Sequence, residues 1–156
     1  MLWLIVVALT GCQPCPGEQL ASGNAEANVN GSDWAAIQVV WVAAGSAVQV
    51  TTPSSDGWEF QIVSQRTADG ATIEEAMGAD AWPIEVSLDG GESGGWALAY
   101  PDAGASYSSA NGGGSLTLDG TDSDELFGCF EFTAATEDGE EISVDHGAFR
   151  ARPSDL

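Results

Sequence analysis

The sequence predicts an all-β domain. We expect an antiparallel β-sandwich of about nine strands with one short helical turn, and a β-barrel is the alternative. Apolar and polar residues alternate in short runs, which is the period of a strand. Turn dipeptides such as Asn30-Gly31 and Asp56-Gly57 separate these runs at short intervals. Several strands are apolar on both faces or irregular, and this pattern favours the sandwich over the barrel.

Between residues 25 and 125 the pattern predicts a series of strands and one helical turn. A strand that is apolar on both faces covers 34–43. The helical turn begins at a capping box, Thr72-Ile73-Glu74-Glu75, and ends near Gly78. The run Gly112-Gly113-Gly114 lacks the lysine and the helix of a phosphate loop, so we interpret it as a flexible connection. The other strands are marked by Val48/Val50, Trp58/Phe60/Ile62, Ile84/Val86/Leu88, Trp96/Leu98/Tyr100, Tyr107 and Leu116/Leu118.

The stretch 126–150 predicts a long β-hairpin. Apolar side chains occupy every second position of its first arm, and Asp138-Gly139 suits a type I′ turn. The large apolar residues of the return arm change parity, so one extra residue is needed and a β-bulge is expected at His146-Gly147. Gly128 lies between apolar strand residues and indicates a bend or a close backbone approach.

This hairpin pattern is Gly-x-Phe-x-Phe-x-Ala, followed by a turn, a strand and Gly-x-Phe. It resembles the C-terminal hairpin of a family of bacterial lipoproteins whose domain has no known function. The resemblance runs from about Glu26 onward and implies a fold without indicating a chemistry. The matching residues are Gly128, Phe130, Phe132, Ala134, Gly147 and Phe149, together with Val29-Asn30-Gly31 and Trp34-Ala35-Ala36 near the start.

The first residues resemble a lipoprotein signal. The apolar run 2–9 is too short to span a bilayer as a lone helix, and it leads into Leu9-Thr10-Gly11-Cys12, which matches the bacterial lipobox. The match implies cleavage before Cys12 and lipidation of that residue, which anchors a protein stably when several acyl chains are attached. Gln13 in place of aspartate then favours the outer membrane in a Gram-negative cell. The expected divisions are a signal peptide at 1–11, a flexible Pro/Gly/Ser-containing tether at 12–24 and a single all-β domain at 25–156.

Composition limits the partners. The chain has 24 acidic residues, three arginines and no lysine, which gives a formal net charge of −21. Such a charge argues against binding to nucleic acid and against electrostatic adhesion to anionic lipid. The expected partners are therefore the membrane, through lipid at Cys12, and an unknown envelope protein or glycan.

Two thiols remain once Cys12 is lipidated. Exported proteins meet oxidising conditions, so Cys15 and Cys129 can form a disulfide that joins the tether to the hairpin. The alternative is a buried Cys129 that acts as a small hydrophobic residue, with Cys15 free. Sequence alone leaves both readings open because the geometry decides between them.

No cofactor is expected, and calcium is the weak alternative. The acidic stretch 119–125 offers oxygen ligands in a predicted hairpin loop, but their order does not match an EF-hand. An acidic solvated turn is the simpler interpretation in a chain of this charge. The weak metal candidates are Asp119, Asp122, Asp124 and Glu125.

No catalytic residues are predicted. His146 is the only histidine, and a lone histidine at a bulge is usually structural. A Ser-His-Asp triad cannot be assembled, and a thiol nucleophile would need Cys129 and His146 to meet across the hairpin. Trp82 is the tryptophan expected to be exposed, as in a carbohydrate-binding face.

These observations predict a lipid-anchored cell-envelope protein, not an enzyme, with a binding or structural β-sandwich domain whose ligand is unknown. Two alternatives stay open. One is a carboxylate-based hydrolase that acts on envelope or extracellular carbohydrate, and the other is a calcium-dependent adhesion module.

Overall fold

The computed structural model describes residues 15–53, 56–90 and 94–155, and it is all-β. One 3₁₀ turn and one short helix accompany ten strands in these ranges. The elements are η1 (Pro16–Gln19), β1 (Asn24–Val29), β2 (Ser32–Ile37), β3 (Val40–Ala44), β4 (Ala47–Thr51), β5 (Trp58–Ser64), α1 (Ile73–Gly78), β6 (Ile84–Ser87), β7 (Gly95–Pro101), β8 (Tyr107–Asp122), β9 (Glu125–Ala135) and β10 (Glu141–Pro153).

The sheet closes into a barrel, the alternative expectation, and is not the favoured sandwich. Seven strands form the closed path β10–β3–β4–β5–β7–β8–β9, and β9 pairs with β10 again. Three strands lie outside it: β1 and β2 extend from β10, and β6 extends from β8. The long strands β8, β9 and β10 have 16, 11 and 13 residues and carry irregularities in register. Such bulges bend and twist a sheet until its edges meet, which leaves no open edge in the closed part.

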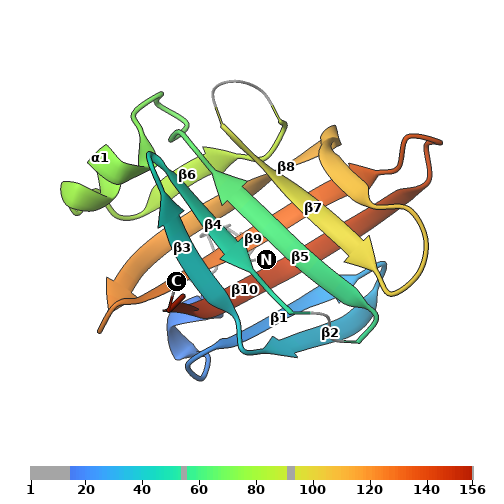
Figure 1. Ribbon diagram of the computed structural model, residues 1–156, viewed down its shortest axis with the longest axis horizontal. Coiled ribbons are helices and arrows are strands. Elements are labelled where there is room, and N and C mark those ends of the chain that lie inside the picture. The colour runs from blue at the N-terminus through green and yellow to red at the C-terminus, as the bar shows by residue number, and fades with distance from the viewer. Residues whose placement is uncertain (1–14, 54–55, 91–93, 156) are drawn as a thin grey trace, which may run out of the picture.

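The barrel has two opposite walls, which Figure 1 shows one behind the other. The front wall consists of β3, β4, β5 and β7, and the back wall consists of β8, β9 and β10. The seam between β3 and β10 is short and parallel, with two residue pairs, Arg152 with Val40 and Pro153 with Trp41. At the other seam β7 and β8 also share two pairs. Each seam is short because β1 or β6 takes up the neighbouring part of the same long strand.

Aromatic rings fill the space between the walls. Phe60 of β5 is fully buried, and its ring centroid lies 5.8 Å from that of Phe132 and 6.3 Å from that of Phe130, both on β9. Trp34 of β2 packs edge-on against Phe60 at 4.6 Å. Edge-to-face aromatic pairs add about 0.5–1.5 kcal/mol beyond the area that they bury. The front and back walls are therefore held together by one aromatic core.

The C-terminal hairpin is confirmed as β9 and β10, with the register shift between Val144 and Gly147. His146 in the bulge has a φ of 54°, in the left-handed region. A Cβ at Gly128 would lie 2.2 Å from the Thr117 carbonyl oxygen of β8 and 3.1 Å from the Phe149 ring, so the close backbone approach expected there is present. The predicted type I′ turn at Asp138-Gly139 was wrong. Of these two residues only Gly139 has a positive φ, and Thr136 N–H donates to the Glu140 carbonyl across a three-residue loop.

Two expectations between the ends of the chain have different outcomes. The capping box is present: Glu75 N–H donates to Thr72 Oγ1 at 3.2 Å, and Thr72 N–H donates to Glu75 Oε2 at 3.1 Å. The glycine run 112–114, expected to be a flexible connection, instead lies within β8. Cβ atoms at Gly112 or Gly114 would collide with the β9 backbone, so glycine lets the two strands approach closely.

Candidate functional site

The N-terminal segment is fastened to the outer face of the back wall. Cys15 forms a disulfide with Cys129 of β9 across 114 positions of sequence, and their Cα atoms are 5.6 Å apart. This is the first of the two readings for these thiols, and it differs from the flexible tether expected at 12–24. From Cys15 onward the described part of that stretch is attached to the barrel. Residues 12–14 lie outside the described residues.

The 3₁₀ turn η1 lies flat on the back wall because of one glycine. Gly17 is buried, and a Cβ there would lie 2.7 Å from the carbonyl oxygen of Gly128 and 2.8 Å from that of Phe149. Pro16 opens the turn and fixes its own φ, which suits a first helical position. A larger residue at position 17 would lift the whole segment away from β9 and β10.

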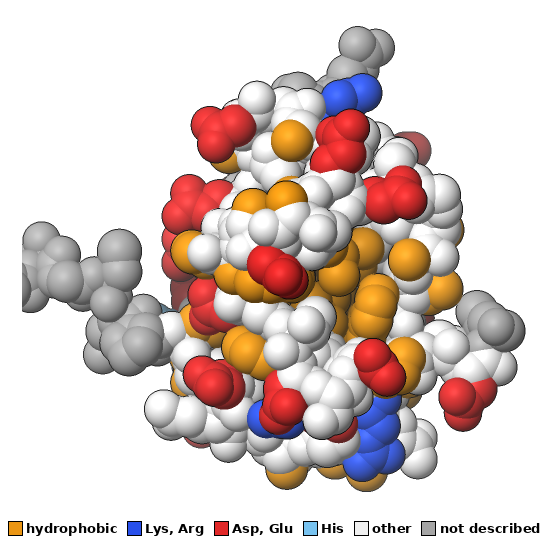
Figure 2. Space-filling model, turned by 90° about the vertical axis from the view of Figure 1, so that its left-hand side faces the viewer, with side chains coloured by type: hydrophobic (Ala, Val, Ile, Leu, Met, Phe, Trp, Pro, Cys, Tyr) orange, Lys and Arg blue, Asp and Glu red, His pale blue; other side chains and the backbone are white. Residues whose placement is uncertain are grey.

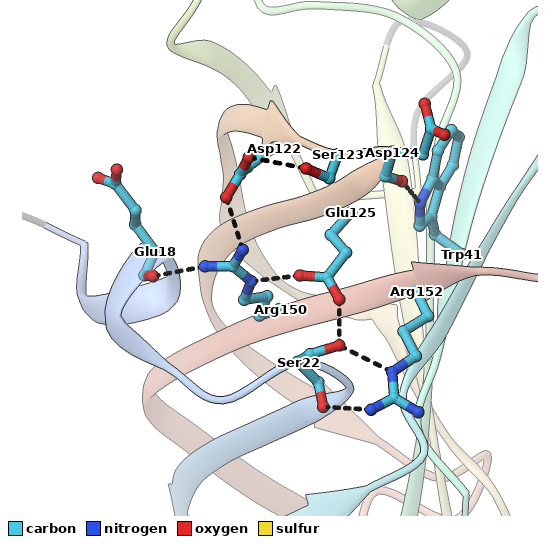
Figure 3. Close-up of polar contacts among 9 residues, drawn as sticks. All are labelled: Glu18, Ser22, Trp41, Asp122, Ser123, Asp124, Glu125, Arg150 and Arg152. Carbon is cyan, nitrogen blue, oxygen red and sulfur yellow. Dashed lines mark hydrogen bonds and ion pairs between the residues drawn. The ribbon is translucent and has the colours of Figure 1, made fainter.

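Arg150 of β10 connects β8, β9 and the N-terminal turn η1 (Figure 3). Its Nε donates to Glu125 Oε2 at 2.5 Å, its Nη2 donates to Asp122 Oδ2 at 2.8 Å, and its Nη1 donates to the Glu18 carbonyl at 2.9 Å. The side chain of Glu125 is 15% exposed and that of Asp122 is 61% exposed, so the bond to Glu125 is the better shielded of the two ion pairs. The two carboxylates, Glu125 first, raise the pKa of Arg150.

Ser22 and Arg152 extend this network to the start of β1. Ser22 Oγ donates to Glu125 Oε1, and Arg152 Nε donates to Ser22 Oγ at 2.8 Å. Arg152 Nη2 also donates to the Ser22 carbonyl at 3.1 Å. The Ser22 hydroxyl, and after it Arg150, hold the pKa of Glu125 below its usual value. Two of the chain's three arginines thus secure the N-terminal segment.

The acidic stretch proposed as a metal ligand set does not converge. Asp122 ends β8 and Glu125 begins β9, so the loop is reduced to Ser123-Asp124, both with positive φ. Asp122 and Glu125 pair with Arg150, while the Asp124 carbonyl accepts a bond from Trp41 Nε1 at 3.0 Å. Within 15–53, 56–90 and 94–155, no three His, Cys, Asp or Glu residues are placed to hold a metal ion.

Asp119 is set apart from the other metal candidates. It is half-buried on β8, three residues before the strand ends at Asp122. Burial, with a smaller contribution from the negative charge of Glu18, raises its pKa. Folding therefore disfavours the ionised form of Asp119, whereas it favours that of Glu125.

The lone histidine lies beside an open hollow of about 450 Å³ on the β1–β2 side of the barrel. His146 is exposed, and the carboxylates of Glu26, Asp33 and Asp56 line the same hollow. The thiol nucleophile weighed from the sequence is not available to His146, because Cys129 is in the disulfide. The hollow is acidic and open to solvent, which suits a hydrated surface.

A second hollow of about 440 Å³ lies between α1 and β6. Figure 2 looks onto the side of the molecule that carries α1, where hydrophobic side chains gather between carboxylates. The hollow between α1 and β6 is lined by apolar residues that include Ala76, Pro83 and Ile84, and by the acidic residues Asp69 and Glu75.

Trp82, expected to be exposed, is half-buried and packs against the hydrophobic core. Ile37 of β2 is the only large hydrophobic residue that is fully exposed in the described parts of the chain, at 65%.

Sequence reasoning missed the residues that form the attachment. Glu18, Ser22, Arg150 and Arg152 were not singled out. A signal was available, because Arg150 and Arg152 are two positions apart on a strand and so lie on one face. In a chain with three basic residues, such a pair points to an internal use of the positive charge.

In comparisons with known proteins, no family model, no curated protein and no solved structure matches this chain. Over the residues that the structure describes, none of the helices has the length and apolar character needed to cross a bilayer.

Proposed function

We propose that the protein is a lipid-anchored component of the bacterial cell envelope, with a binding or structural β-domain held close to the membrane. The disulfide between Cys15 and Cys129 carries the proposal. Disulfides persist in exported proteins and are rare in the cytosol, so the bond agrees with a chain that leaves the cell interior through the signal at 1–11. Gln13 favours the outer membrane in a Gram-negative cell.

The attachment of the N-terminal segment also limits the distance between the proposed lipid anchor and the barrel. Two residues separate the lipidated Cys12 from Cys15, so the lipidated Cα lies within about 11 Å of the Cys15 Cα, three steps of 3.8 Å. A tether that ran free to residue 24 would reach about four times as far. The disulfide and the bonds of Arg150 and Arg152 hold the segment that follows Cys12 on the back wall. A lipid at Cys12 would therefore keep this wall on the membrane side of the barrel.

The mass of the mature protein tests the proposal. Expression from Met1 should yield a chain that lacks its first eleven residues and carries an added acyl mass, and Cys12→Ala should abolish both changes. Cell fractionation should then place the wild-type protein with the outer membrane. An intact, unmodified chain in the soluble fraction would overturn the anchoring.

The described geometry bears on one of the two alternative functions, the calcium-dependent adhesion module. A calcium module would need the stretch 119–125 to release Arg150, since Asp122 and Glu125 are paired with it. Calcium titration followed by tryptophan fluorescence distinguishes this alternative, because Trp41 bonds the Asp124 carbonyl and would report any rearrangement of the turn.

A further inference from the structure

The outer face of the front wall carries an ordered array of side chains. Strand registers align them in two complete rows across β3, β4, β5 and β7. The inward neighbours, such as Val50, Phe60 and Ala97, are buried, so the array points outward. The rows are Val42–Gln49–Val63–Trp96 and Val40–Thr51–Gln61–Leu98, with Ala44–Ala47 and Glu59–Tyr100 at either end.

This array, which we call the front face, is almost uncharged. It has three positions on each of four strands, and Glu59 is the one charged residue among these twelve. The chain as a whole carries 24 acidic residues. In Figure 1 the front wall faces the viewer, and no described helix or strand crosses in front of it. A neutral surface on such an acidic protein suits a neutral ligand, because a cationic partner would be drawn to the other faces.

The chemistry of the front face is amphipathic. Trp96 and Tyr100 stand four residues apart on β7, about 13 Å along the strand. Gln49 Nε2 donates to Thr51 Oγ1 at 3.0 Å, and Gln61 Nε2 donates to Glu59 Oε1 at 3.1 Å. These bonds use one N–H of each amide and hold the side chains in place, while the amide oxygens are acceptors for a ligand. Aromatic rings beside fixed acceptors match a ligand with apolar C–H faces and hydroxyl donors, which is the chemistry of a sugar.

Size and position select a chain-like ligand over a second protein. A stable protein interface uses about 20–30 residues on each side, and the front face offers twelve. A narrow polymer can bind across such a face without covering more of the barrel. The front face also lies on the wall opposite the attached N-terminal segment, as β5 is separated from β9 by strands on either side. If the proposed anchoring holds, the front face is directed away from the membrane.

We infer that the front face binds an uncharged polysaccharide, with Trp96 and Tyr100 stacking on sugar rings and Gln49, Gln61 and Glu59 accepting bonds from hydroxyl groups. This inference deepens the proposed function, on which its orientation at the membrane rests.

Affinity electrophoresis of the mature protein in detergent tests the inference. Native gels containing hydroxyethyl cellulose, a soluble β-1,3-glucan or dextran should retard the protein in at least one case, and polygalacturonate gels should not. Trp96→Ala should weaken the retardation by about tenfold or more, as expected when a large aromatic side chain supplies a main contact. Trp96→Phe should keep most of it. Ile37→Ala is the matched control, since it removes an exposed apolar side chain outside the front face.

Three results would overturn the inference. They are a lack of retardation in all neutral gels, equal retardation in polygalacturonate, and unchanged retardation of Trp96→Ala. Sedimentation in the absence of polysaccharide adds a fourth: a dimer that Trp96→Ala dissociates would assign the face to a second copy. If the protein has the acylated mass but binds no polysaccharide, the proposed anchoring stands and the polysaccharide inference fails. If the protein is unmodified but binds polysaccharide, the inference stands and the anchoring fails.

Discussion

The back and front walls share one core but treat their outer faces in opposite ways. The back wall is covered by the chain's own N-terminal segment, held by the disulfide at Cys129 and by the bonds of Arg150 and Arg152. The front wall carries a face with one charged residue, whose side chains are mostly half-buried and over which no described helix or strand passes. Core packing is satisfied on both sides by inward residues such as Phe60 and Phe130. The outer positions are therefore free to differ, and we expect them to carry the function.

Among substitutions on the two walls, removal of the disulfide on the back wall should cause the largest loss of unfolding free energy. Replacing both cysteines, Cys15→Ser with Cys129→Ser, should lower the free energy of unfolding by about 4 kcal/mol, because the bond closes a loop of 114 positions. Urea unfolding followed by tryptophan fluorescence measures the change, and treating the wild type with a reductant should reproduce it. A loss below about 1 kcal/mol would mean that the segment contributes little to the back wall.

Close packing of η1 should give the next largest effect. Gly17→Ala places a Cβ against the Gly128 and Phe149 carbonyl oxygens and should cost about 2 kcal/mol in urea unfolding. Gly78→Ala at the exposed end of α1 is the control, since nothing lies within 4 Å of its added Cβ. It should change stability by less than about 0.5 kcal/mol or raise it slightly. Equal losses in the two variants would contradict the packing of η1 on the barrel.

Charge at the attachment should give a smaller, pH-dependent effect. Folding lowers the pKa of Glu125 from its ordinary value near 4.5, so its ionised form stabilises the fold above that pH. This stabilisation is lost as the pH falls through the lowered folded-state pKa. Glu125→Gln should cost about 1–2 kcal/mol at pH 7 and progressively less in acid. Urea unfolding from pH 7 down to 3 measures the difference. Exposed Glu131 on the same strand provides the control Glu131→Gln. If the unfolding free energy of both variants depended on pH in the same way, the stabilising role of ionised Glu125 would be wrong.

Substitutions on the front face should have the smallest effect on the free energy of unfolding. Gln61→Thr removes the hydrogen bond to Glu59 but leaves the core untouched, so the free energy of unfolding should change by less than about 0.5 kcal/mol. The same unfolding assay checks this value. A loss above about 1 kcal/mol would show that the face is part of the fold and not a surface kept for a ligand.

Local chemistry determined much of the fold from the sequence by itself. Alternation of apolar residues predicted most of the strands, and the change of parity predicted the bulge at His146-Gly147. The single strand expected over 34–43 was wrong, because the chain turns at Gln38, with a φ of 64°, and forms two strands, β2 and β3. The capping box at Thr72 likewise depends on neighbours three residues away. Such features are readable because the interacting groups are close in the chain. The glycine run 112–114 was misread because a glycine demanded by a neighbouring strand looks the same in sequence as a glycine in a loop.

Only the tertiary structure decided how the strands close and where the N-terminal segment goes. Closure depends on two short seams, and each seam pairs residues from distant parts of the chain. Ser22 meets Glu125 across 103 positions, and Cys15 meets Cys129 across 114. The front face likewise exists only because four strands align in register. Each of these arrangements is set by the packing of the whole barrel, so no local pattern in the sequence encodes it.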